Sequence, residues 1–250
     1  MRIALVHPGE MGAAIGAALR EGGHDVQWAS EGRSAETAAR ARAAGLEDAG
    51  TLERLRGADV VLSVCPPHAA LDVSRALAGG TGLYVDANAV SPATARAAAE
   101  LHPRFVDGGI VGPPPTEPGT TRLYLSGGEA ELVAGLFAGG PLEARVLGSA
   151  VGAASALKMT YAAWTKGSAA LLLSTAAVAD AHGVGEALRA EWEASLPGLD
   201  ARLERATSAA DRKAWRWAGE LEEVAATFVA GGQPGGFGRA AAEVYRTWRT

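Results

Sequence analysis

The sequence predicts a Rossmann-type α/β domain with a mostly parallel sheet, followed by an all-α domain that a long interdomain helix joins to it. Short apolar runs alternate with alanine-rich helical segments over residues 1–150, a pattern typical of a parallel sheet covered on both faces. No convincing strand follows residue 150. Residues 148–180 are apolar nearly all round, which indicates a buried helix. We therefore expect domains over residues 1–150 and 151–250.

The first half opens with a strand, a turn, a helix and a second strand. Arg2–Val6 is an aliphatic run followed by the breaker His7-Pro8-Gly9. A helix is expected over Met11–Glu21 and a strand over Asp25–Ala29, which gives a unit of about 30 residues, the size of a βαβ crossover. Further strands are expected over Asp59–Val64, Leu83–Asp86, Phe105–Asp107, Arg122–Ser126 and Ala144–Leu147, with helices over Ala35–Ala44, Ala69–Ala78, Pro92–Leu101 and Glu129–Leu136.

The turn after the first strand partly matches a dinucleotide-binding fingerprint. The three glycine positions of G-x-G-x-x-G are occupied by His7, Gly9 and Gly12. Gly9 allows the backbone to approach a pyrophosphate, and Gly12 allows close packing of helix on strand, but His7 replaces the first glycine. An ordinary strand–helix turn is the alternative. The residues expected to contact the cofactor here are His7, Pro8, Gly9, Glu10, Met11 and Gly12.

The end of the second strand indicates which dinucleotide is bound. NAD enzymes usually carry an acidic residue about twenty residues after the glycine turn, and Ser30 stands there instead. Ser30 and Ser34 can donate to a phosphate, and Arg33 can bind one with two hydrogen bonds, which favours NADP(H). Glu31 is evidence against this choice, since it can accept from a ribose hydroxyl. Arg33 as a solvated loop residue is the other interpretation.

Two later strand ends supply further candidates. One strand ends in the segment Ser63-Val64-Cys65-Pro66-Pro67, in which Val64, Cys65 and Pro66 are expected to contact the cofactor and the prolines to form a wall beside the nicotinamide ribose. Asn88 follows the next strand and can both donate and accept, as orienting a carboxamide or a substrate requires, so we expect it to bind cofactor and substrate and to take part in catalysis. We expect Cys65 to be a small buried hydrophobe rather than a nucleophile. The glycine-rich loop predicted over residues 107–115 is either a substrate wall or a purely structural turn.

The long apolar helix carries a lysine, Lys158, near the predicted domain junction. A lysine in such a place is a candidate for proton transfer, and the alternative is a side chain that extends its ammonium group out of a packed helix. Lys158 and Lys166 interrupt the run, so it is too short to cross a membrane. Lys166 and Tyr161 are the substitutes for Lys158 in proton transfer.

The second half reads as helical throughout. Ala214, Trp217, Leu221, Val224 and Phe228 form one apolar stripe at helical spacing. Ser208 is expected to cap this helix. A last helix is expected over Arg239–Trp248. The long apolar helix has more apolar surface than so small a domain can cover, so a homodimer through the helical half is expected.

Composition sets outer limits. The 250 residues are 48% hydrophobic and 20% charged, which is ordinary for a globular protein. A net charge of −5 disfavours nucleic-acid binding. With Cys65 as the sole cysteine, an internal disulfide is impossible and a reducing compartment fits best. We expect a cytoplasmic protein with no signal peptide, no membrane association and no bound metal, acting on a small-molecule substrate.

With these pieces in place, the chain resembles the β-hydroxyacid dehydrogenase and 6-phosphogluconate dehydrogenase superfamily. More narrowly, it looks like the bacterial phosphogluconate-dehydrogenase-like proteins with a short helical C-terminal domain of unassigned function. The matching segments are HPGEMG, SVCPP, VDANAVSP, VDGGIVGPP, GAASALK and KAWRWAGELEEVAATF. The resemblance implies an NADP-binding domain over residues 1–150, a helical substrate and dimerisation domain over 151–250, and Lys158 as general acid/base beside C4 of the nicotinamide.

The departures from the superfamily pattern concern the substrate. Val111-Gly112-Pro113 stands where relatives have a Ser-Gly-Gly that grips the substrate carboxylate. Asn88 stands where many have a serine, and Ala162, four residues after Lys158, stands where many have an asparagine that contacts the substrate. The residues expected to bind the substrate are Asn88, Val111, Gly112, Pro113, Tyr161 and Ala162. The expected substrate is therefore neither 3-hydroxyisobutyrate nor 6-phosphogluconate. An imine or ketimine reductase is one alternative, which Lys158 disfavours because such enzymes of this superfamily usually lack it. A non-catalytic dinucleotide-binding sensor is the other.

Overall fold

A computed structural model describes residues 1–248, and the chain forms two compact units, Met1–Lys158 and Met159–Thr250. The division falls inside helix α6 (Ala153–Ala162), whereas the sequence predicted a boundary after residue 150. Each unit has its own secondary-structure class, so we describe them separately.

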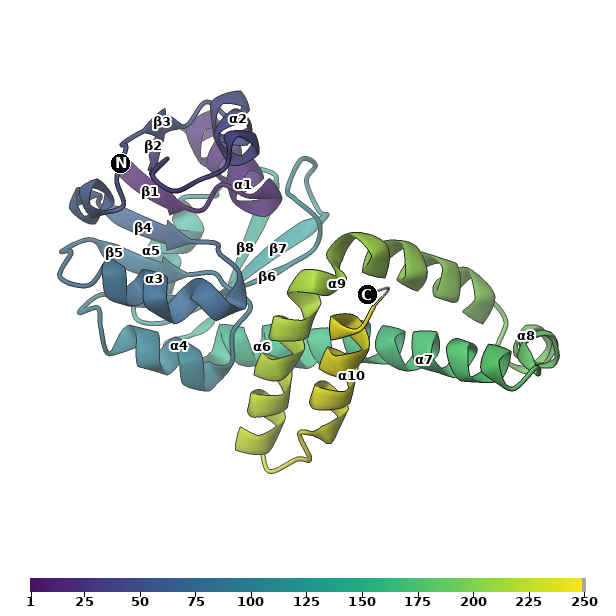
Figure 1. Cartoon of the computed structure of the whole chain (residues 1–250). Helices are drawn as coiled ribbons and strands as arrows, with labels where there is room; N and C mark the ends of the chain where they lie inside the picture. The colour runs from purple at the N-terminus through teal and green to yellow at the C-terminus, as the bar shows by residue number, and fades with distance from the viewer. Residues whose placement is uncertain (249–250) are drawn as a thin grey trace. The chain divides into compact units, whose positions relative to one another are not determined.

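Unit 1 contains one eight-stranded sheet of order β3-β2-β1-β4-β5-β6-β7-β8 (Figure 1). The β6–β7 pair is antiparallel, and every other pair of neighbouring strands within residues 1–248 is parallel. The Rossmann-type fold class is thus confirmed. The strands are β1 (Arg2–Val6), β2 (Asp25–Trp28), β3 (Glu47–Asp48), β4 (Val60–Ser63), β5 (Leu83–Asp86), β6 (Phe105–Val111), β7 (Thr121–Ser126) and β8 (Leu142–Gly148).

The inner strands β1, β4, β5 and β6 are buried on both faces, which explains their unbroken apolar runs in the sequence. Ile3 and Leu5 of β1 pack in a core with α1, α2 and α5, while Ala4 and Val6 face a second core with η1 and α4. Successive residues of a strand point to opposite faces, so one run serves both cores. The helices are α1 (Glu10–Glu21), α2 (Ala35–Ala43), α3 (Ala70–Ala76), α4 (Pro92–Ala99) and α5 (Ala130–Gly135), with 3₁₀ turns η1 (Glu53–Gly57) and η2 (Pro67–Ala69).

Unit 2 is helical throughout its described residues, as the sequence predicted. Gly238 of α10 packs on Ala225 of α9, where a Cβ at Gly238 would lie 2.8 Å from the Ala225 nitrogen. Trp192 of α8 packs with Leu172 and Ala176 of α7. A π-helical turn, η3 (Ala163–Gly167), precedes α7 (Ser168–Ala181), α8 (Gly185–Ser195), α9 (Leu199–Ala230) and α10 (Gly236–Arg246). None of the helices within residues 1–248 combines the length and hydropathy needed to cross a bilayer.

Several local predictions need correction. The residues after Asp107 continue β6 as far as Val111, so the predicted loop is shorter. Gly109 of this strand allows helix α6 to lie against it, and Gly108 lies against Asp86 and Ala87 at the end of β5. Ser208 lies in the middle of α9 and caps nothing. The strand β3 was missed, since Glu47-Asp48 has no apolar pattern.

The long apolar helix is also less buried than the sequence predicted. Leu171 and Val178 of α7 are 70% and 59% exposed, whereas Leu172, Leu173 and Ala176 of the same helix are buried. The helix is apolar on all sides, but the chain covers one side only. This exposed side of α7 is apolar surface that the chain itself leaves in solvent.

Candidate active site

Three strands, β1, β4 and β5, end at the same level along one edge of the sheet, beside Asp107 of β6. The pairing register aligns Val6 with Ser63, Ser63 with Asp86, and Asp86 with Asp107. The residues that come next in the chain therefore begin the carboxyl edge, where ligands of doubly wound sheets bind. Those residues are His7, Val64 and Ala87, and β6 continues past this level through Gly108 to Val111. This edge brings together the predicted segments that follow β1, β4 and β5.

The turn after β1 has the geometry of a dinucleotide turn. A Cβ at Gly12 would lie 2.6 Å from the carbonyl oxygen of His7, so only glycine allows α1 to start this close to β1. At Gly9, by contrast, a Cβ would meet nothing nearer than His7 Cδ2 at 3.8 Å. Gly9 thus leaves open space on the side where a pyrophosphate would approach the backbone. The two glycines fit a dinucleotide for different reasons.

The start of α1 supplies the electrostatic part of that fit. Gly9 is its N-cap residue, and within the described part of the chain no side chain caps the helix. The first N–H groups of a helix lack intrahelical partners and lie at the positive end of its dipole, where an anion binds well. Exposed Glu10 in the first turn is a charge of the wrong sign and reduces the benefit. The turn still fits a pyrophosphate better than a neutral ligand.

His7 makes a contact that the sequence did not predict. Arg33, in the loop after β2, donates from Nη1 to His7 Nδ1 at 2.7 Å. Because a guanidinium has no acceptor, Nδ1 must be the unprotonated nitrogen of a neutral ring. Burial lowers the pKa of His7 below its usual 6.5, and the charges of Arg33, Arg40 and His68 lower it further. The neutral acceptor form is thus the favoured one.

The two serines predicted to bind phosphate have structural partners. Ser34 caps α2, its Oγ accepting from the Thr37 N–H at 3.2 Å. Ser30 donates a side-chain hydrogen bond to Asp48, which, with the Gly50 N–H, lowers the pKa of that carboxyl group. Asp48 ends β3, next to β2, and sequence reasoning missed it because β3 itself gave no signal. A carboxylate therefore stands near the residues predicted to select NADP(H).

Asn88 connects two strand ends. It is 2% exposed, and its Oδ1 accepts from the Cys65 N–H at 2.6 Å while its Nδ2 donates to Ser63 Oγ at 3.0 Å. The amide therefore fixes the loop that carries Val64, Cys65 and Pro66. The sequence did not predict this structural role for Asn88. Burial raises the pKa of the Cys65 thiol to about 12, as expected for an inert cysteine.

The start of α6 is held by a buried carboxylate that sequence reasoning missed. Asp107 Oδ2 accepts from Ser126 Oγ at 2.9 Å and from the N–H groups of Gly152 and Ser155 at 3.0 Å each. Its Oδ1 accepts from Ser155 Oγ at 2.6 Å. Ser126 Oγ in turn accepts from the Ala154 N–H at 3.1 Å. These hydrogen bonds satisfy the N–H groups at the start of the helix that have no intrahelical partner, and they fix α6 to β6.

Lys158 lies on α6 directly over β6. A Cβ at Gly109 would approach Lys158 Cβ to 2.9 Å and the Ala154 carbonyl oxygen to 2.7 Å, so any side chain at residue 109 would displace the helix. Gly109 lies beyond the level at which β5 ends, so Lys158 is at the carboxyl edge described above. Half-buried Lys158 is thus a titratable side chain that α6 places at the predicted cofactor edge.

The residues predicted to bind the substrate differ in burial and do not all belong to the same unit. Val111 is a strand residue, 3% exposed, rather than part of a loop. Gly112 has φ of +129° and starts the turn toward β7, and the Pro113 carbonyl accepts from Thr121 Oγ1. Tyr161 and Ala162 belong to unit 2, where Tyr161 is 48% exposed and Ala162 is 1% exposed. The buried methyl group of Ala162 offers no surface to a substrate in the chain as described.

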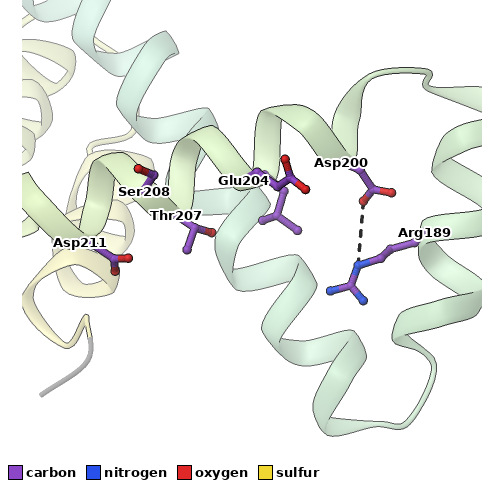
Figure 2. Close-up of a pocket in the computed structure, with 7 residues that line it drawn as sticks. Arg189, Asp200, Glu204, Thr207, Ser208 and Asp211 are labelled. Atoms are coloured by element: carbon purple, nitrogen blue, oxygen red, sulfur yellow. Dashed lines mark ion pairs between the residues drawn. The ribbon is translucent and has the colours of Figure 1, made fainter.

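Unit 2 contains two polar features outside the predicted site. Lys166 of η3 forms an ion pair with Glu220, whose side chain is 3% exposed, and the Tyr245 hydroxyl donates to the Lys166 carbonyl at 2.9 Å. Between α8 and α9 lies an open hollow (Figure 2) in which Arg189 is 4.0 Å from Asp200. The hollow is lined by Arg189, Asp200, Leu203, Glu204, Thr207, Ser208 and Asp211. None of these residues was predicted to be functional.

Comparison with known proteins gives relatives along most of the chain. A protein of Methanothermus fervidus described as an uncharacterized 28.5 kDa protein in the 7S RNA 5′ region is 33% identical over 189 residues, covering 74% of this chain and 73% of that protein. Residues 179–248 match a family described as a domain of unknown function, DUF1932.

Solved structures extend the similarity to nearly the whole chain. One is a conserved protein of unknown function described as structurally similar to 3-hydroxyacid dehydrogenases, with 28% identity, a TM-score of 0.72, and coverage of 98% and 96% of the two chains. A conserved hypothetical protein from Sinorhizobium meliloti has 27% identity, a TM-score of 0.71, and coverage of 98% and 87%. Two enzymes share the fold at 20% identity. For 3-hydroxyisobutyrate dehydrogenase from Mycobacterium tuberculosis the TM-score is 0.69, with coverage of 99% of this chain and 93% of that chain. For an imine reductase from Streptomyces aurantiacus the TM-score is 0.52, with coverage of 98% and 93%.

The Rossmann sheet, its glycine turn and the helical second unit define the class of two-part, nicotinamide-dinucleotide-dependent oxidoreductases. Within that class, the chain belongs to the β-hydroxyacid dehydrogenase superfamily.

Proposed function

We propose that the protein is an NADP-dependent oxidoreductase that interconverts a secondary alcohol and a ketone on a small polar substrate, with Lys158 as general acid/base. The observation that carries this is the placement of Lys158 over Gly109, at the sheet edge that also carries the glycine turn. When bound, the nicotinamide supplies or accepts the hydride at C4.

In this proposal Lys158 transfers the proton. In the reducing direction its ammonium group gives a proton to the substrate oxygen, and in the oxidising direction the neutral amine takes the hydroxyl proton. Asp107 and Ser126 hold the helix that carries it, and Asn88 fixes the loop of Cys65 and Pro66 beside the cofactor edge. Asn88 thereby acts on the cofactor and substrate through the shape of this wall.

Arg33 supports the choice of NADP(H) over NAD(H). Its guanidinium can bind a 2′-phosphate with two charge-assisted hydrogen bonds. The start of α2 lies next to it, and Ser34 is the N-cap residue there. Asp48, near Ser30, opposes the choice, because a carboxylate repels a phosphate and can accept from a ribose hydroxyl. Arg33→Ala should weaken NADPH binding about ten- to a hundredfold, the value of a hydrogen bond to a charged group, and NADH binding much less.

The substrate remains defined by class. Val111-Gly112-Pro113 replaces a carboxylate-gripping segment, which supports a substrate other than 3-hydroxyisobutyrate or 6-phosphogluconate. The exposed apolar side of α7, including Leu171 and Val178, supports a homodimer formed through the helical unit. One cysteine and no disulfide partner support a cytoplasmic location.

Cofactor consumption across a panel of alcohols, ketones and imines tests the proposal. Turnover of alcohols or ketones with NADP(H) is the expected result. Imines are included because an imine reductase shares the fold of this chain. Turnover of imines alone would favour the imine reductase alternative. Tight cofactor binding with no turnover on the whole panel would favour a dinucleotide-binding sensor.

A further inference from the structure

His7 occupies a backbone conformation that favours glycine. Its φ is +74°, and among residues 1–248 it is the only non-glycine residue with positive φ. A side chain in this region costs free energy, although histidine tolerates it better than most residues. The superfamily pattern has glycine here, so the imidazole ring is an addition that the turn itself does not need. The contacts of the ring are therefore the place to look for its function.

Within the described residues, the hydrogen-bond partner of the His7 ring is Arg33, whose Nη1 lies 2.7 Å from His7 Nδ1. His68 and Arg40 also influence the ring electrostatically, but Arg40 Nη1 is bound to Glu36 at 2.7 Å and His68 is exposed on η2. Arg33 is the residue proposed above to bind the 2′-phosphate. The imidazole of the glycine turn and the phosphate-binding arginine thus form one hydrogen-bonded pair.

We propose that His7 is a positioning residue for cofactor selection: its Nδ1 holds Arg33 at the adenosine end of the site, in place for the 2′-phosphate of NADPH. This inference rests on the function proposed above. An arginine side chain carries a large rotamer entropy, and an arginine already held by an acceptor loses less of it when the phosphate binds. The remaining N–H groups of the guanidinium fork stay available to the phosphate.

Removal of the ring tests the proposal. His7→Gly suits the backbone conformation, so the variant should fold with a urea midpoint no lower than that of the parent. Isothermal titration calorimetry of the full chain with NADPH and with NADH then gives the ratio of the two dissociation constants. His7→Gly should weaken NADPH about two- to tenfold, the value of losing one immobilised side chain, and leave NADH unchanged. His7→Asn, which keeps an acceptor and tolerates positive φ, should restore part of the ratio.

Two further variants make the result specific. In an Arg33→Ala background, His7→Gly should have no further effect on NADPH, because the two residues act as one unit. His68→Ala removes a neighbouring exposed imidazole and should leave the ratio unchanged. Equal weakening of both cofactors, an unchanged ratio, or tighter NADPH binding in His7→Gly would overturn the proposal. If the parent prefers NADH or binds neither cofactor, the proposed function itself fails, and that titration reveals it before any His7 variant is made.

Discussion

Lys158 stands at the cofactor edge because the strand beneath it carries no side chain. Its Cβ lies where a Cβ on Gly109 would meet it at 2.9 Å, so the lysine backbone is as close to β6 as a glycine allows. A general acid or base acts only within hydrogen-bond reach of the proton it moves, and this packing fixes where that reach begins. The position of the residue is thus set by its neighbours in unit 1.

Lys158→Met keeps much of the stem volume and should fold normally. We expect NADPH affinity within about twofold of the parent, since the ammonium acts on the substrate, and turnover lower by about 10²–10⁴, the usual contribution of a positioned acid or base. Fluorescence titration and single-turnover hydride transfer measure the two quantities. Full activity in this variant would reject Lys158, and Lys166, Tyr161 or a bound water would then carry the proton.

His102 gives a pH prediction that is independent of the site. Its Nε2 lies 3.0 Å from Ser74 Oγ, its ring stacks on Tyr84 at 4.0 Å, and burial lowers its pKa below the usual 6.5. The unfolded chain therefore binds a proton at a higher pH than the folded chain does. The contribution of His102 to the free energy of unfolding should be complete above pH 6.5. It should decrease as the pH falls below 6.5 toward the lowered pKa of the folded chain.

Urea unfolding at pH 7.5 and pH 5.5 measures this effect. His102→Phe keeps a ring against Tyr84 but cannot titrate, so its loss of stability between the two pH values should be smaller than that of the parent. His7, whose pKa is also lowered by burial, contributes to the parent in the same direction and is unchanged in the variant. An equal loss in parent and variant would show that His102 does not contribute.

At the scale of secondary-structure elements, α6 is the one that the site depends on. Its first N–H groups donate to Asp107 and Ser126, which belong to the neighbouring antiparallel strands β6 and β7. Gly109 then lets the helix lie against β6. Caps and this glycine together define both the start of the helix and its distance from the sheet.

Asp107→Asn should loosen this attachment. The amide has one acceptor oxygen in place of two, so the buried donors can no longer all be satisfied, at a cost of about 1.5–3 kcal/mol in unfolding free energy. Turnover should fall while NADPH affinity stays near that of the parent, because the turn after β1 is untouched. Ser91→Ala, which removes the cap of α4, is the matched control and should cost about 1 kcal/mol with little effect on turnover.

Sequence patterns predicted the strands whose residues are apolar on both faces, such as β1 and β5, because burial dictates their composition. They missed β3, a two-residue edge strand of acidic residues, and with it Asp48. The role of Asp107 was also out of reach, since its donors at Gly152 and Ser155 lie 45 and 48 residues away along the chain. The His7–Arg33 pair spans 26 residues and gave no local signal.

At the scale of the whole molecule, each unit has its own core, and the exposed side of α7 is the open question. Leu171 and Val178 are one heptad apart and are both more than half exposed, at 70% and 59%. Residues at this spacing lie on the same face of a helix. A second copy of the chain would cover them, which supports the proposed homodimer.

Light scattering at micromolar concentration tests the assembly. We expect the mass of two chains for the parent and of one chain for Leu171→Glu, because a carboxylate at the centre of an apolar contact loses its hydration there. Thr175→Glu on the same helix places the same charge one turn away and shows how far the contact extends. A parent that has the mass of one chain at every concentration would remove the dimer from the proposal.

The buried carboxylate of Asp107 has a consequence for how the protein is made. A ribosome has synthesised every strand of the sheet once it reaches Gly148, yet three of the groups that bind this carboxylate belong to Gly152 and Ser155. Until those residues emerge, closing the sheet around Asp107 would bury a charge that, of the hydrogen-bond partners described above, has Ser126 alone. The nascent first unit is therefore expected to complete its packing only after the start of α6 has left the exit tunnel.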